Sequence, residues 1–101
     1  MPGYHRAELS AEMKIVPSAQ GEQAPRAQIE AGQQAANTSG LARESGPDST
    51  TLAGGRSEVL GAVFEVIEAS LDAGARVVEV KVEAQEEPGR FSGAGGRRSS
   101  R

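Results

Sequence analysis

The side chains that most often carry out catalysis are scarce in this chain. Its 101 residues include one histidine, His5, and no cysteine, which excludes a disulfide, a redox-active thiol and a cysteine-ligated metal. A catalytic pair or a metal site needs several convergent partners, and no second histidine can join His5. We therefore expect no enzyme, no metal and no cofactor. Catalysis would require a partner subunit to contribute the reacting groups.

A glycine pair followed by an arginine, Gly54–Ser57, stands where a strand is expected to turn into a helix. Backbone N–H groups at a helix start attract anions, and Arg56 would add positive charge, so one interpretation is a phosphate site. The spacing differs from a Walker loop, because no lysine follows the glycines. We favour the alternative, a tight turn that ends with Ser57 as the N-cap of the helix.

Charge is distributed unevenly along the sequence. The chain has 11 Lys and Arg against 14 Asp and Glu, a net charge of −3, yet residues 90–101 contain four arginines and no acid. The acidic remainder repels phosphate backbones, so we expect no specific nucleic-acid partner. The Gly- and Arg-rich segment 88–101 is expected to be disordered, and the alternative is a weak polyanion-binding arm.

No apolar stretch approaches the ~20 residues that a membrane span requires. No basic region leads into an apolar block near residue 1, as a secretory signal would need. We therefore expect a cytoplasmic protein with no membrane partner. The sequence divides into a flexible leader (1–6), one domain (7–87) and the tail (88–101).

Hydrophobic periodicity predicts six elements within the domain. Between residues 7 and 17, Leu9, Ala11, Met13 and Ile15 alternate with polar residues, which indicates a half-buried strand ended by Pro17. Residues 75–84 alternate in the same way and predict a last strand. Between them we expect two helices, at residues 23–38 and 57–73, and two short strands, at residues 41–45 and 49–53.

This order of elements predicts a ferredoxin-like βαββαβ fold of the α+β class. Right-handed crossovers place both helices on one face of a four-stranded antiparallel sheet and leave the second face open. If the first and last strands are neighbours, Glu12 and Lys14 lie opposite Lys81 and Glu79 as cross-strand ion pairs.

The two predicted helices differ in the face that they would bury. The first has a face of small residues centred on Ala24, Ala27, Ala31 and Ala35 and flanked by Ile29, Gly32 and Ala36, which would hold the sheet weakly. The second has a wide apolar arc, in which we expect Phe64 to join the core.

Several short motifs, taken in order, resemble the small thiamine-binding protein family, long catalogued as a domain of unknown function. The motifs are Lys14–Pro17, Ser39–Leu41, Gly46–Val59 and Asp72–Val78. The resemblance implies a ferredoxin-like protein that forms homodimers or homotetramers through its sheets. It also implies binding of thiamine or its pyrimidine moiety. The chain departs from the family at Ala53, where an acidic residue is usual, and Glu44 or Glu12 are candidates to replace it.

The resemblance also implies a location for the ligand. Thiamine is a cation with an aminopyrimidine ring, so its site requires a carboxylate and paired polar groups. The matching candidates are Ser49, Thr50 and Thr51 in the family motif, with Ser10 and Glu12 on the outer face of the first strand. The alternative is that the threonines are ordinary strand composition and Glu12 is a solvated charge.

A second function remains open from the sequence. The alanine-rich face of the first helix would leave a monomer marginally stable. The open sheet face could then serve a structural or regulatory oligomerisation module that has no small-molecule ligand.

Overall fold

The computed structural model of the protein describes residues 7–84. The predicted leader (1–6) and tail (88–101) lie outside the described residues, as do residues 85–87 of the predicted domain. Neither helix within 7–84 has the length and apolar character needed to cross a bilayer.

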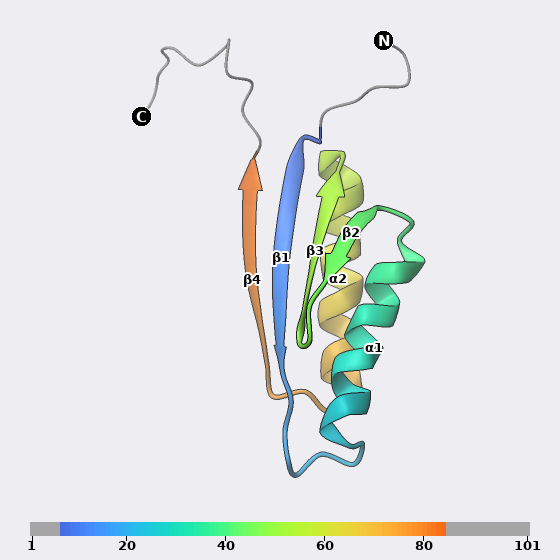
Figure 1. Ribbon diagram of the computed structural model, residues 1–101, viewed down its shortest axis with the longest axis vertical. Helices are drawn as coiled ribbons and strands as arrows, with labels where there is room; N and C mark the ends of the chain where they lie inside the picture. Colours follow the sequence, from blue (N-terminus) through green and yellow to red (C-terminus); the bar gives the residue numbers. More distant parts are fainter. Residues whose placement is uncertain (1–6, 85–101) are drawn as a thin grey trace.

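The six predicted elements are present in the predicted order (Figure 1). Every element boundary lies within two residues of its predicted position. The elements are β1 (Leu9–Val16), α1 (Pro25–Thr38), β2 (Ala42–Ser45), β3 (Ser49–Gly54), α2 (Arg56–Asp72) and β4 (Val77–Ala84). This confirms the α+β, ferredoxin-like βαββαβ fold.

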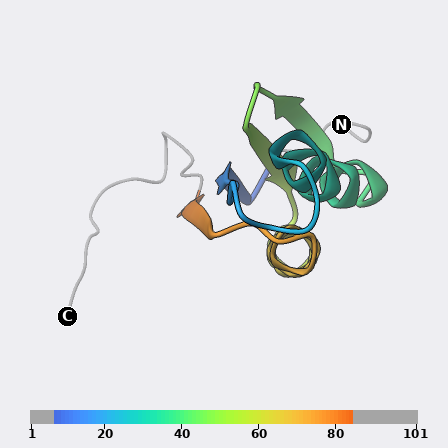
Figure 2. The same ribbon diagram turned by 90° about the horizontal axis from the view of Figure 1, so that it is seen from below.

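The strands form one antiparallel sheet in the order β2-β3-β1-β4. Both helices lie on the same side of it, and α2 lies between α1 and β4 (Figures 1 and 2). The predicted register is confirmed: Glu12 lies opposite Lys81, and Lys14 lies opposite Glu79. The predicted ion pairs are not formed, because the charged groups of neither pair come within salt-bridge distance.

The core fills the space between the sheet and the helices. Met13 and Ile15 of β1, Leu52 of β3, and Val59 and Val66 of α2 are completely buried. Each such aliphatic side chain contributes roughly 1.5–3 kcal/mol through burial, so these residues hold the layers together.

The buried face of α1 is rotated from the predicted centre toward the predicted flank, which contains Ile29, Gly32 and Ala36. The helix buries Gln28, Ile29, Gly32 and Ala36, whereas Ala24 is exposed. Gly32 sets this orientation, because a Cβ there would meet the Ser70 hydroxyl of α2 and the Ile15 side chain of β1. The helix therefore makes its closest contact at Gly32, and Ala27, Ala31 and Ala35 are only half-buried.

Gln28 is buried because its amide satisfies the backbone of the loop between β1 and α1. Its Oε1 accepts the Ser18 N–H at 2.8 Å. Its Nε2 donates to the carbonyl oxygens of Ser18 (2.9 Å) and Gln23 (2.8 Å). A buried polar group with its partners in place carries no desolvation penalty for unmade bonds, and here it fixes the loop.

Two predictions for α2 are wrong. Its N-cap is Gly55, with no side-chain cap, so Ser57 lies inside the first turn. Phe64 is 59% exposed and does not join the core. The core contacts are made by Val59, Val63 and Val66, and Phe64 projects from a different side of the helix.

Candidate functional site

The sheet face opposite the helices is not covered by any element in the described part of the chain (Figure 2). Residues directly opposite each other on antiparallel strands project from the same face. Buried Ala11 and Met13 face the helices, so Ser10, Glu12 and Lys14 face the other way. The candidate site lies on this open face.

One row of side chains crosses all four strands on the open face. Thr51 of β3 lies opposite Glu44 of β2 and opposite Glu12 of β1, and Glu12 in turn lies opposite Lys81 of β4. Neighbouring strands lie about 4.8 Å apart, so the two glutamates flank Thr51 with their backbones roughly 10 Å from each other. This row therefore places a hydroxyl between two carboxylates on the open face.

Two further cross-strand pairs border this row. Ser10 lies opposite Ala53, and Lys14 lies opposite Ser49. We call the polar set the open-face cluster: Ser10, Glu12, Glu44, Ser49 and Thr51. Four of its members were predicted from the sequence. The fifth, Glu44, had been named only as a replacement for the acid missing at position 53.

Thr50, the remaining predicted site residue, is not part of the open-face cluster. It lies opposite Met13, is completely buried on the helix side, and donates its hydroxyl to the Glu44 carbonyl oxygen at 3.4 Å. Side chains alternate along a strand, so Thr50 and Thr51 cannot face one ligand. The sequence did contain a signal for the buried position of Thr50. Residues two apart on a strand share a face, so if the apolar Leu52 faces the helices, Thr50 must face them as well.

The β4 side of the open face carries alternating charge. A shallow hollow of about 250 Å³ is lined by Glu12, Lys14, Glu79 and Lys81, with Val80 between them. Lys81 lies opposite Glu12 and offsets its charge, whereas the one cross-strand neighbour of Glu44 is Thr51. Glu44 therefore presents the less compensated carboxylate of the pair.

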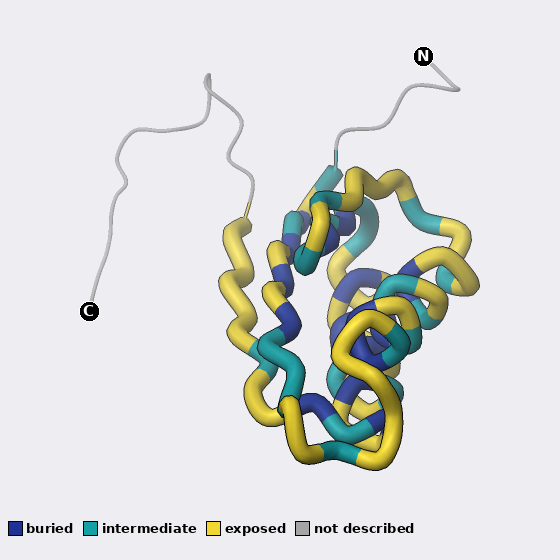
Figure 3. Tube along the Cα trace, turned by 60° about the horizontal axis from the view of Figure 1, so that its bottom comes forward, coloured by how far each residue is buried: buried dark blue, intermediate teal, exposed yellow. Residues whose placement is uncertain are grey.

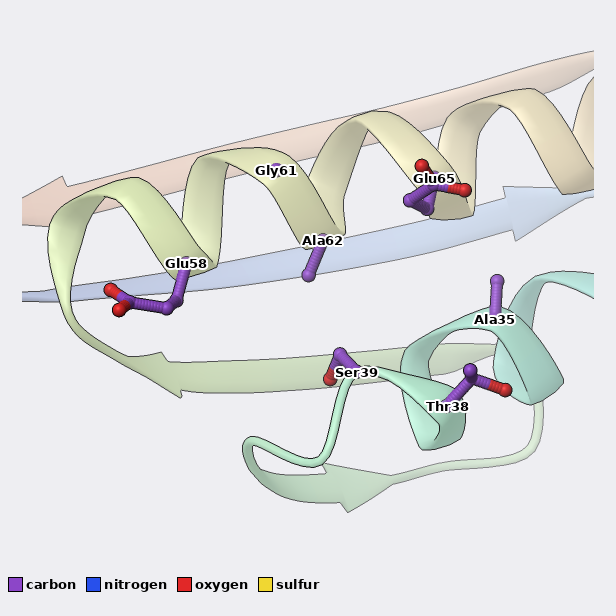
Figure 4. Close-up of a pocket in the computed structure, with 7 residues that line it drawn as sticks. All are labelled: Ala35, Thr38, Ser39, Glu58, Gly61, Ala62 and Glu65. Carbon is purple, nitrogen blue, oxygen red and sulfur yellow. The ribbon is translucent and has the colours of Figure 1, made fainter.

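A larger groove, of about 550 Å³, lies between the two helices (Figure 4). Small residues, among them Ala35, Gly61 and Ala62, line much of it, and Glu58 and Glu65 lie on the α2 side. Figure 4 shows Glu58 extending along α2 toward the start of the helix, away from Glu65. The two carboxylates do not converge on one point.

The hydroxyls of this groove are already used by the protein. Thr38 donates to the Gln34 carbonyl oxygen at 3.0 Å, and Ser39 donates to the Ala36 carbonyl oxygen at 2.6 Å. These bonds complete the end of α1, where helix carbonyls lack partners within the helix. The open-face cluster is therefore the better candidate site, because it combines carboxylates and hydroxyls on one surface.

At the turn before α2, the position where an anion could bind is occupied by a carboxylate of the protein, that of Glu8. The Arg56 N–H donates to Oε1 of Glu8 at 2.8 Å. A carboxylate at a helix N-terminus is favoured for the same reasons as a phosphate. Glu8 thus occupies the position considered for phosphate. Among the described residues, no group of three or more acidic or histidine side chains could hold a metal ion.

Comparisons with known proteins identify relatives of the fold. No family model matches the sequence, and no curated protein matches it. A domain of unknown function, DUF77, from Bacillus cereus is 24% identical, with a TM-score of 0.64 over 81% of this chain and 78% of that one. A Streptococcus pneumoniae protein is 21% identical, with a TM-score of 0.68 over 78% of this chain and 88% of that one.

A third solved structure carries a functional description. It is a candidate thiamine biosynthesis/salvage protein from Thermotoga maritima, 20% identical, with a TM-score of 0.60 over 81% of this chain and 86% of that one. Identities of this size show a shared fold. The chain therefore has the fold of the DUF77 protein and of this thiamine-related protein.

Proposed function

We propose that this protein binds a small cationic aminopyrimidine compound, thiamine or its pyrimidine precursor, on the open sheet face and does not transform it. The observation that carries the proposal is the position of Thr51 between Glu44 and Glu12. The fold shared with a candidate thiamine biosynthesis/salvage protein supports the same ligand class.

The open-face cluster matches the chemistry of such a ligand. The carboxylates of Glu12 and Glu44 would face the positive charge and accept the exocyclic amine, since hydrogen bonds to charged groups are the stronger ones. The hydroxyl of Thr51 can donate to a ring nitrogen. This assigns charge recognition to the glutamates and ring orientation to the Thr51 hydroxyl.

A single flat face covers only one side of a ligand. Pockets for small molecules usually bury about 70–90% of the ligand surface. The described open face contains no aromatic ring, because Phe64 projects from α2 on the other side of the sheet. We therefore include in the proposal a second copy that covers the ligand, giving a homodimer or homotetramer.

Calorimetric titration of the full chain with thiamine tests the proposal. We expect measurable binding that Glu12→Gln and Glu44→Gln each weaken by about tenfold, the equivalent of ~1.4 kcal/mol. Glu68→Gln, an exposed glutamate on α2, is the matched control and should leave the affinity unchanged. Absence of heat at about 1 mM thiamine would reject the ligand class.

The second candidate is an oligomerisation module without a small-molecule ligand. The observation that favours it is the exposure of Leu60 (44%), Phe64 (59%) and Leu71 (49%) on α2. The same titration separates the two candidates. A stable assembly that gives no heat with thiamine, and keeps its mass when thiamine is added, would support the module.

A further inference from the structure

The groove between α1 and α2 differs in charge from two other hollows on the surface. The hollow beside β4 is lined by as many lysines as glutamates. A polar hollow of about 290 Å³ between α1 and β2 is lined by one glutamate and one arginine. The groove between the helices is lined by Glu58 and Glu65 and by no basic residue. Its charge is therefore uncompensated, which favours a cationic occupant.

Neither of these two glutamates has a cationic partner in the described part of the chain. The ion pair formed within residues 7–84 joins two residues of α1 that do not line the groove. Glu58 and Glu65 are exposed and lie seven residues apart on α2. Seven residues make nearly two helical turns, so both lie on the same side of the helix, with their backbones about 10.5 Å apart. The groove therefore presents two separate carboxylates, with Gly61 and Ala62 between them.

The chain leaves the described structure close to this groove. Ala84 ends β4 and Gly54 ends β3, and both lie opposite Leu9 of β1. Two strand spacings separate them, roughly 10 Å, and α2 begins directly after Gly55. The last residues of β4 are exposed (Figure 3), and α1 ends toward the same end of the molecule (Figure 1). The segment that follows Ala84 therefore starts beside the end of the groove where Glu58 lies.

This segment has the charge that the groove lacks. Residues 7–84 contain twelve acidic and six basic side chains, whereas residues 90–101 contain four arginines and no acid. Two serines separate Arg98 from Arg101. In an extended chain with three residues per turn, residues three apart project from the same side and lie about 9 Å apart. The spacing of the two arginines thus matches that of the two carboxylates, and the serines are small enough to lie over Gly61 and Ala62.

We propose that the groove between α1 and α2 binds an arginine-rich segment, and that its occupant is residues 98–101 of the same chain. Arg98 then faces Glu58, and Arg101 faces Glu65. Guanidinium and carboxylate groups form paired, charge-assisted hydrogen bonds. The long arginine side chains accommodate the direction of Glu58, which extends toward the start of α2 (Figure 4). This inference goes beyond ligand binding on the open face and does not depend on it.

The connection between β4 and the arginines is long enough for this contact. Thirteen residues separate Ala84 from Arg98, and fully extended they would span roughly 45 Å. A short connection within one chain also holds the two partners at an effective concentration on the order of 1 mM. Exposed ion pairs are individually weak, and this high local concentration allows two of them to retain the segment.

The open face is a less suitable place for the same arginines. Lys14 and Lys81 project from it and would repel a further cation. Docking in the helix groove leaves the open-face cluster uncovered. It also occupies the arginines that would otherwise be available to a polyanion.

A spin label on the full chain tests the proposal. The chain has no cysteine, so Ser100→Cys provides a single attachment site between the two arginines. In NMR spectra at low salt, the label should remove most of the intensity of the backbone amide signals of Ala35, Gly61 and Ala62, because these residues line the groove. Amide signals of the open face, such as that of Thr51, should lose less.

Charge reversal on the labelled chain tests the assigned pairs. Glu65→Arg alone and Arg101→Glu alone should each restore most of the lost intensity, because like charges then face each other. The two changes together should cause the loss again. Glu83→Arg is the matched control, and the loss should persist in it. Glu83 is exposed and closer to the segment in sequence, but it lies opposite Ser10 on the open face.

Three other results would overturn the proposal. Full intensity of the groove amides in the labelled chain would mean that the segment does not dock there. Equal effects of Glu65→Arg and Glu83→Arg would show that only net charge attracts the segment. A mixture of spin-labelled chain and isotope-enriched, unlabelled chain reports contact between copies. An equal loss of intensity in that mixture would mean that the occupant comes from another copy.

Discussion

The α1 side and the β4 side of the molecule use their side chains in opposite ways. On the α1 side, small residues permit close contact between the helix and its neighbours, and side-chain amides form hydrogen bonds to the backbone of the loops. Gln33 Nε2, for example, donates to the carbonyl oxygens of Gly46 (2.9 Å) and Ser49 (3.1 Å) in the β2–β3 turn. On the β4 side, large apolar groups such as Phe64 and Val82 remain exposed.

The short sheet edge is also secured on the α1 side. Arg43 of β2 donates to the Asn37 side chain of α1 at 2.6 Å. Nothing comparable is present along β4 within residues 7–84, where the edge and the neighbouring helix flank are both exposed. The α1 side is therefore complete within one chain, whereas the β4 side has the composition of a surface that another molecule covers.

The close packing of the α1 side should respond most strongly to substitution. Gly32→Val should destabilise the fold by about 3 kcal/mol, because the added side chain overlaps Ser70 and Ile15. Chemical denaturation measures the change in the free energy of unfolding. Gly61→Val is the matched control: a Cβ there meets nothing within 4 Å, so the change should stay within about 0.5 kcal/mol. Equal effects at both glycines would show that the two helices are not in close contact.

The importance of Gly32 shows where sequence reasoning reaches its limit for the fold. Period-2 alternation located β1 and β4 and predicted that Glu12 would lie opposite Lys81, because a strand's pattern determines which residues face the core. The rotation of α1 could not be predicted. It depends on how closely another helix approaches Gly32, and that distance is not encoded in the pattern of α1 alone.

The candidate site was predictable to a similar extent. Ser10, Glu12, Ser49 and Thr51 share the open face as expected, because the alternation of β1 and the β1–β3 pairing decide it. The place of Glu44 beside Thr51 required the register of β2, a strand too short and polar to show a pattern.

A somewhat smaller effect tests the polar anchoring of the α1 side. Gln28→Leu should destabilise the fold by about 2 kcal/mol, because the Ser18 N–H and the carbonyl oxygens of Ser18 and Gln23 lose their partner. The readout is again denaturation, and amide hydrogen exchange at Ser18 should become faster. Gln34→Leu, on the exposed face of α1, is the control. A stable Gln28→Leu variant would mean that water replaces the amide in that loop.

A third pair of changes compares a buried residue and an exposed residue of α2. Val66→Ala removes buried methyl groups and should cost about 1.5 kcal/mol at any protein concentration. Phe64→Gln should cost about 0.5 kcal/mol or less in dilute solution, because most of the ring already contacts water. At high concentration the cost of Phe64→Gln should grow, since association stabilises only the wild type. Melting temperatures measured over a dilution series distinguish the two, and a concentration-independent Phe64→Gln effect would argue that association leaves Phe64 uncovered.

The contact between the tail arginines and the groove beside α1 should be the weakest on that side of the molecule. Raising the salt from about 0.01 M to about 1 M shortens the Debye length from about 30 Å to about 3 Å. The two pairs that Arg98 and Arg101 form with Glu58 and Glu65 are worth roughly 0.2–1 kcal/mol each, so docking should weaken by about twofold to thirtyfold. The intensity that the Gly61 amide signal loses at each salt concentration measures this. The double variant Glu65→Arg, Arg101→Glu should respond equally, because it has the same number of pairs. A contact that tightens with salt would show that apolar contacts alone hold the segment, and that charge does not select the groove.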